Sequence, residues 1–158
     1  MNLRVYVETS VISYLAARPS TDAVNMTRQF QSLRLWQAQD SLDLLVSPLV
    51  VQECLAGDAT AANVRMGFCS SLPQMPMLDS ALPLARELVD SQAIPAGSFV
   101  DAVHIAVASV HELDFIASWN FKHIAGAIPR QRVEACLRRL KVHVPAIATP
   151  EEILESIL

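Results

Sequence analysis

The sequence predicts an α/β domain in which a mostly parallel sheet is covered by helices on both faces. Short apolar, β-branched runs at 3–7, 42–47 and 114–118 alternate with segments of helical periodicity. Consecutive parallel strands need crossover segments, and helices usually form them. At 158 residues, with 52% hydrophobic and 18% charged residues, the chain is long and apolar enough for one well-filled core. We therefore predict a single domain over residues 1–158.

Caps and prolines set the predicted boundaries in the first half of the chain. Pro19 ends the first helix, Asp22 can cap the second, and Pro48 suits the first turn of a helix. The run at 42–47 is nearly continuous in apolar residues, as a buried strand is. The predicted elements are strand 3–7, helix 11–15, helix 22–39, strand 42–47, helix 48–55, helix 58–71 and a short strand 75–78.

The second half continues the alternation of helices and strands. Ser98 or its neighbours can cap a strongly apolar helix, and Thr149-Pro150 followed by two glutamates is a strong helix start. The aromatic and β-branched residues at 114–118 favour a strand. The predicted elements are helix 80–89, loop 94–97, helix 100–111, strand 114–118, helix 131–141, a last strand within 142–148 and a helix from 150.

Composition limits the classes of protein to consider. No apolar run approaches the roughly 20 residues of a membrane-spanning helix, and residues 1–4 lack the features of a signal peptide, so we expect a cytoplasmic protein. Cys54, Cys69 and Cys136 are odd in number and form no C-x-x-C pair, which indicates reduced core thiols. The net charge of −4 argues against a broad nucleic-acid-binding surface but leaves a local basic patch open.

Four polar residues stand where an open parallel sheet binds its ligands. Glu8 and Asn120 follow the carboxyl ends of predicted strands, whereas Glu53 and Asp101 fall in helices. Each has an ordinary explanation: Glu8 faces solvent, Asp101 complements a helix dipole, and Asn120 caps a turn. Glu53 is more suggestive, because a carboxylate in an apolar helix needs water, a partner or a cation. Carboxylates are the ligands of Mg²⁺, which can activate water against a phosphodiester.

Four segments in order resemble the motifs of PIN domains. The first, 5–15, is a hydrophobic strand that ends in the acid Glu8 and a hydroxyl residue. The second, 48–53, ends in Glu53, and the third, 101–108, begins with Asp101. The fourth, 116–124, carries Trp-Asn-Phe-Lys-His-Ile. Together they cover most of the chain. The resemblance implies a three-layer α/β/α fold. It also implies a metal-dependent ribonuclease similar to the toxins of VapBC-type toxin–antitoxin pairs.

The resemblance also implies roles for individual residues. Glu8, Glu53 and Asp101 would hold Mg²⁺ or Mn²⁺, and Asn120 would assist catalysis through its side-chain oxygen or a water. It further implies an RNA substrate, a protein antitoxin and a homodimer formed by the apolar early helices. The first position is usually Asp and the fourth is usually acidic. Because this chain has Glu8 and Asn120 there, a catalytically weak or inactive binding protein is the alternative.

Several neighbouring residues are possible supports for the site. Thr9 and Ser10 can position Glu8, bond a water or cap the first helix, and capping is the safer assignment. His104 follows Asp101 by one helical turn and can reach the carboxylates or a phosphate, although a buried, satisfied histidine is more ordinary. Lys122 can meet substrate phosphates.

Two further questions stay open at the level of sequence. Trp36 and Trp119 can stack on bases, but packing in the core or an interface is their more ordinary role. A small-molecule phosphohydrolase is another alternative function. It has little support, because the chain has four glycines and no Gly-x-Ser-x-Gly, Walker or Gly-x-Gly-x-x-Gly motif.

Overall fold

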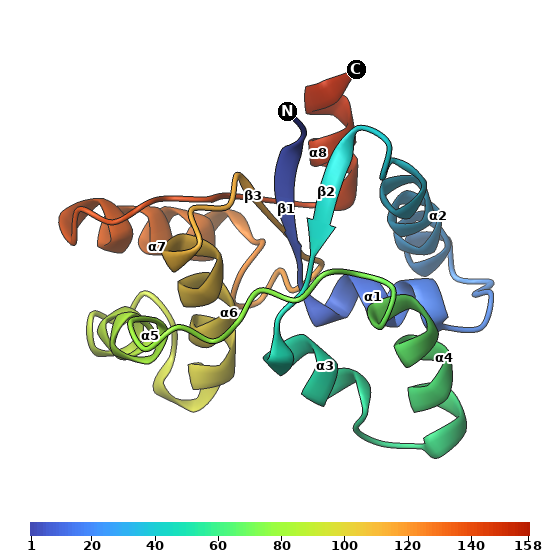
Figure 1. The fold of residues 1–158 in the computed structure, drawn as a ribbon, viewed down its shortest axis with the longest axis horizontal. Coiled ribbons are helices and arrows are strands. Elements are labelled where there is room, and N and C mark those ends of the chain that lie inside the picture. Colours follow the sequence, from blue (N-terminus) through green and yellow to red (C-terminus); the bar gives the residue numbers. More distant parts are fainter.

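A computed structural model describes all residues 1–158 and contains one parallel four-stranded sheet with the strand order β2-β1-β3-β4 (Figure 1). Val5 in β1 pairs with Leu44 in β2 and with Phe115 in β3, and Ile116 in β3 pairs with Ile147 in β4. The predicted fold class is confirmed. The strands are β1 (Leu3–Val7), β2 (Leu42–Leu45), β3 (Phe115–Ala117) and β4 (Ala146–Ala148).

Helices cover both faces of the sheet. Figure 1 shows α5, α6 and α7 on one side and α1, α2 and α4 on the other. None of these helices has the length and apolar character needed to cross a membrane. The helices are α1 (Thr9–Ala16), α2 (Ala23–Gln37), α3 (Pro48–Cys54), α4 (Ala59–Cys69), α5 (Ala81–Asp90), α6 (Phe99–Val110), α7 (Ala127–Arg139) and α8 (Pro150–Ile157), with a 3₁₀ turn at Ala96–Ser98.

The central position of β1 follows from its side chains. Val5, Tyr6 and Val7 are all buried, so both faces of the strand are covered. The helix that precedes β3 along the chain, α6, is just as apolar, and every residue from Ala102 to Ser109 is buried. The core therefore lies on both faces of the sheet, with α6 supplying much of it on one face and α1 and α2 contributing on the other.

Three of the predicted helix starts are confirmed by caps, whereas Ser98 precedes α6 without a capping hydrogen bond from its side chain. The side chain of Asp22 accepts a hydrogen bond from the Asn25 amide, and Ser47 caps α3, which has Pro48 in its first turn. Thr149 and Glu152 form a reciprocal capping box at α8. All three cysteines are buried and free, as predicted.

Two predictions, a short strand at 75–78 and the start of the helix near residue 131, are wrong. Residues 75–78 form no strand, and only Gln74 makes an isolated bridge, to Val46. Pro73 and Pro76 flank the bridge, and because proline has no N–H to donate, the ladder does not extend. Helix α7 begins at Ala127 rather than at 131. Pro129 is tolerated in its first turn, because the N–H groups of a helix's first turn have no partner within the helix, so the missing N–H of proline costs no hydrogen bond there.

Candidate active site

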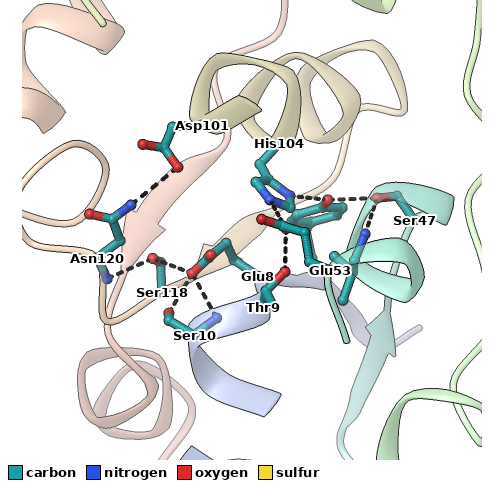
Figure 2. Close-up of polar contacts among 11 residues, drawn as sticks. Glu8, Thr9, Ser10, Ser47, Glu53, Asp101, His104, Ser118 and Asn120 are labelled. Atoms are coloured by element: carbon teal, nitrogen blue, oxygen red, sulfur yellow. Dashed lines mark hydrogen bonds and ion pairs between the residues drawn. The ribbon is translucent and has the colours of Figure 1, made fainter. Parts of the chain in front are cut away.

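Glu8 is the first residue beyond β1 and the N-cap of α1. Its side chain is only 5% exposed, so its charge needs donors. One oxygen, Oε2, accepts hydrogen bonds from the Ser10 amide at 3.2 Å, from Ser118 Oγ at 2.8 Å and from Ser10 Oγ (Figure 2). The other oxygen, Oε1, accepts no hydrogen bond from the protein. The carboxylate is thus fixed on one side and free on the other.

Glu53, on α3, is held in the same one-sided way. Its Oε1 accepts hydrogen bonds from Thr9 Oγ1 and His104 Nε2, both at 2.6 Å, and its Oε2 has no protein partner (Figure 2). Burial raises the pKa of Glu53, but the hydrogen bond and charge of His104 and the hydrogen bond from Thr9 outweigh burial. The pKa of Glu53 therefore lies below its ordinary value, and the side chain is ionised at neutral pH.

A row of buried polar groups stands behind Glu53. The ring of His104 is fully buried, and its Nδ1 lies 2.6 Å from the Tyr6 hydroxyl. That hydroxyl in turn lies 2.8 Å from Ser47 Oγ. Burial raises the pKa of Tyr6 far above its usual value, so the hydroxyl keeps its proton and bridges the two neighbours. The row connects the middle of the sheet to Glu53 and restricts the position of its carboxylate.

Asp101 lies in the first turn of α6 and faces the turn that follows β3. Its Oδ2 is 2.8 Å from His123 Nδ1, and its Oδ1 accepts a hydrogen bond from Asn120 Nδ2 at 3.3 Å. The amide oxygen of Asn120 accepts from the His123 backbone N–H at 3.1 Å. Asn120 therefore caps its own turn and presents its nitrogen, not its oxygen, to Asp101.

Ser118 joins the two halves of the site. Its Oγ donates to Glu8 and accepts from the Asn120 backbone N–H at 3.0 Å, so hydrogen bonds run from Glu8 through Ser118 and Asn120 to Asp101 (Figure 2). Glu53 reaches the same edge through its bond to Thr9, the chain neighbour of Glu8. The tertiary structure brings the four residues singled out by sequence to one end of the sheet.

The side chains at this site offer carboxylate oxygens, which are the type of ligand that a divalent cation such as Mg²⁺ prefers. No three His, Cys, Asp or Glu side chains in the chain are grouped as joint ligands of a metal ion. Mg²⁺ commonly takes one or two carboxylates and keeps several waters, however. The oxygens of Glu8 and Glu53 that have no protein partner are suitable ligands of this kind. Asp101 differs, because both of its oxygens already have partners.

The preferred capping role for Thr9 and Ser10 is wrong, whereas the alternative that Ser10 positions Glu8 agrees with the structure, and sequence reasoning missed some of the residues that surround the acids. Glu8, rather than Thr9 or Ser10, caps α1, and the two hydroxyls donate to Glu53 and Glu8. Ser118 and Tyr6 lie within strands or at their ends, where their side-chain partners leave no pattern in the sequence. Lys122 is exposed and makes no ion pair or side-chain hydrogen bond.

Two solved structures resemble this chain over most of its length. The Mycobacterium tuberculosis toxin VapC20, which cleaves the sarcin-ricin loop, is 20% identical with a TM-score of 0.56, covering 75% of this chain and 91% of its own. Rickettsia felis VapBC2, bound to a DNA fragment from its promoter, is 11% identical with a TM-score of 0.60, covering 93% and 98%. The chain has the PIN fold of the VapC toxins.

Sequence comparison adds nothing to this structural result, since no protein-family model matches the chain and no curated protein is similar to it. The PIN fold places the four candidate residues at the carboxyl end of the parallel strands. Open α/β sheets bind their ligands at this end.

Proposed function

We propose that this chain is a metal-dependent endoribonuclease and the toxin member of a toxin–antitoxin pair that acts in the cytoplasm. The observation that carries the proposal is the one-sided fixing of Glu8 and Glu53, each with one oxygen bound by the protein and one left for a ligand. The VapC20 structure, described as a toxin that cleaves the sarcin-ricin loop, supports the choice of RNA as substrate. The VapBC2 structure supports a protein antitoxin.

Glu8, Glu53 and Asp101 would hold Mg²⁺ or Mn²⁺. The bound cation would offset charge on the scissile phosphate and lower the pKa of a water that attacks phosphorus. Thr9 and His104 hold Oε1 of Glu53 and leave its other oxygen without a protein partner. Asp101 would contribute an oxygen only by giving up its bond to Asn120 or to His123.

Partner binding is assigned to an exposed apolar face of α2. Met26, Phe30 and Leu33 follow helical spacing and are 50%, 59% and 43% exposed, which is unusual for a contiguous row of large apolar side chains. A groove of about 250 Å³ lies between this face and α1, where Leu15 and Pro19 line it. Such a row suits either a second copy of the chain or an apolar antitoxin segment. We propose a homodimer and an antitoxin that uses this region.

Two observations favour a second candidate, a PIN-fold binding or regulatory protein without catalysis. Asn120 presents a nitrogen rather than an oxygen to Asp101, and the three carboxylates are not grouped as joint metal ligands. Metal affinity separates the two candidates, because a site that has lost catalysis through loss of its ligands binds no divalent cation.

The test is calorimetric titration of Mn²⁺ and Mg²⁺ into protein free of any inhibitor, with cleavage of a broad RNA pool on the same samples. Asp101→Asn is expected to weaken both binding and cleavage, since it removes the charge but keeps the shape. Asp40→Asn is the matched control, because Asp40 is exposed and its side chain makes no hydrogen bond or ion pair. Wild-type protein that binds no cation and cuts no RNA would refute the nuclease and favour the binding protein.

A further inference from the structure

Arg28, on α2, lies against three aromatic rings. Its guanidinium carbon is 5.9 Å from the ring centre of Tyr14, 5.7 Å from that of Trp119 and 5.1 Å from that of Phe121. The rings also contact one another, with Trp119 6.2 Å from Tyr14 and 6.3 Å from Phe121. We call these four residues the Arg28 cluster. It joins two helices to the turn after β3.

The Arg28 cluster is built on the same turn as the candidate active site. Trp119 stands between Ser118 and Asn120 in the chain, and its backbone N–H donates to Ser10 Oγ at 2.8 Å. Ser10 Oγ in turn donates to Glu8. Figure 2 shows Ser10, Ser118 and Asn120 gathered around Glu8. The turn that carries the cluster's aromatic rings is therefore anchored by hydrogen bonds to Ser10 and, through it, to Glu8.

The guanidinium of Arg28 has unused capacity to bind an anion. Arginine has five N–H donors, and the single protein acceptor of Arg28 is the Tyr14 hydroxyl at 3.1 Å. It forms no ion pair, whereas Arg130 in α7 is paired with Glu152. A cation is needed here, because the neighbouring site is acidic and the chain carries a net charge of −4, both of which repel phosphate.

Two of the aromatic side chains differ in their access to a ligand: Trp119 is buried and fixed, whereas Phe121 is exposed. Trp119 is 8% exposed and its Nε1 donates to Ser32 Oγ at 2.8 Å, so it cannot turn toward a ligand. Phe121 is 41% exposed and has no polar atom to explain its place at the surface. An exposed aromatic ring beside an unpaired guanidinium is suited to a base and its phosphate.

We propose that Phe121 and Arg28 form a subsite for one nucleotide of single-stranded RNA next to the scissile bond. Phe121 stacks on the base and Arg28 donates to its phosphate, while Tyr14 and Trp119 hold the guanidinium in place. The strand is single because a base within a duplex has both faces covered. This subsite rests on the proposed nuclease function, since it gives that site its substrate.

The test separates binding from cleavage. Anisotropy of a fluorescent single-stranded RNA is measured with EDTA, and KM and kcat are measured with Mn²⁺. Arg28→Ala and Phe121→Leu are each expected to raise the dissociation constant and KM by about 5- to 150-fold, as loss of one stacked base does, with kcat nearly unchanged. Arg34→Ala is the control, because Arg34 lies on the same helix and contacts only Gln31. Thermal unfolding checks that each variant is folded.

The outcomes distinguish the subsite from the nuclease. Folded variants with wild-type RNA affinity and KM overturn the subsite and leave the nuclease standing. A variant that keeps its RNA affinity but loses a co-purifying protein assigns the cluster to a protein partner and also overturns the subsite. Wild-type protein that binds the RNA through these two residues yet never cleaves supports the subsite and refutes the nuclease. Wild-type protein that binds no single-stranded RNA overturns both.

Discussion

Replacing Tyr6 by Phe removes one hydroxyl group from the buried row behind Glu53. Phenylalanine fills the same volume, so the change leaves no cavity. The hydroxyl is the partner of His104 Nδ1 at 2.6 Å and of Ser47 Oγ at 2.8 Å, and both neighbours are fully buried. Water cannot replace the lost bonds without entering the core. The substitution therefore measures the contribution of the row to stability.

The size of the effect follows from which groups lose their partners. His104 Nδ1 loses its only hydrogen bond, whereas Ser47 Oγ still accepts from the Val50 amide at 3.4 Å. A buried polar group without a partner costs about 1–3 kcal/mol. We expect Tyr6→Phe to lower the free energy of unfolding by about 2 kcal/mol. For a domain of this size that corresponds to a fall in Tm of about 4–8 °C.

The assay is urea unfolding followed by circular dichroism, with the m-value compared between wild type and variant. Tyr14→Phe is the matched control, because Tyr14 is the only other tyrosine and its hydroxyl bonds to Asn25 and Arg28 in a partly exposed position. That variant is expected to change stability by less than about 0.5 kcal/mol. A Tyr6→Phe protein as stable as wild type would refute the reasoning that the row is fully satisfied and structurally important.

Three further predictions concern a glycine, an ion pair and the site. Gly126→Ala should destabilise by about 1–3 kcal/mol in urea unfolding, because its Cβ would clash with a backbone carbonyl of the preceding turn; equal stability would show that the turn shifts freely. The hydrogen bond from Arg130 lowers the pKa of Glu152, so this pair stabilises the fold above the unfolded pKa near 4.5 and is lost as pH falls through the lowered folded value. Glu152→Gln should therefore be less stable than wild type at pH 7, by under about 1 kcal/mol since the pair is half-exposed, and the difference should shrink as pH falls through the lowered folded pKa. Ser118→Ala removes a donor to Glu8 and should lower Mn²⁺ affinity about 10-fold or more by calorimetry; unchanged affinity would exclude a positioning role.

Most of the fold was predictable because local signals agree with the tertiary arrangement. Apolar runs marked β1 and β2, and caps such as Asp22 and Thr149 marked helix starts that the structure confirms. The failures lie where a local signal is overridden. Residues 75–78 are mostly apolar, which suggested a strand, but Pro73 and Pro76 remove the donors that a ladder needs.

The sequence singled out four residues that the structure brings to one end of the sheet, but it did not indicate the hydrogen bonds between them. Glu53 stood out as a carboxylate in an apolar helix, and the structure gives it two donors, as burial requires. The expected hydroxyl caps were wrong, since Glu8 itself caps α1. Nothing in the order of residues indicated that Ser118 would join Glu8 to Asn120.

The sequence by itself determined the alternation of strands and helices, and it placed Glu8 and Asn120 after strands, because propensity, periodicity and capping depend on residues a few positions apart. The tertiary structure alone decided which atoms meet. Glu8 and Ser118 are 110 positions apart, and Tyr6 and His104 are 98 apart. Their hydrogen bonds form only when the strands pair in the correct register and α6 packs correctly against the sheet. Both conditions are set by the packing of the whole core, which no short stretch of sequence specifies.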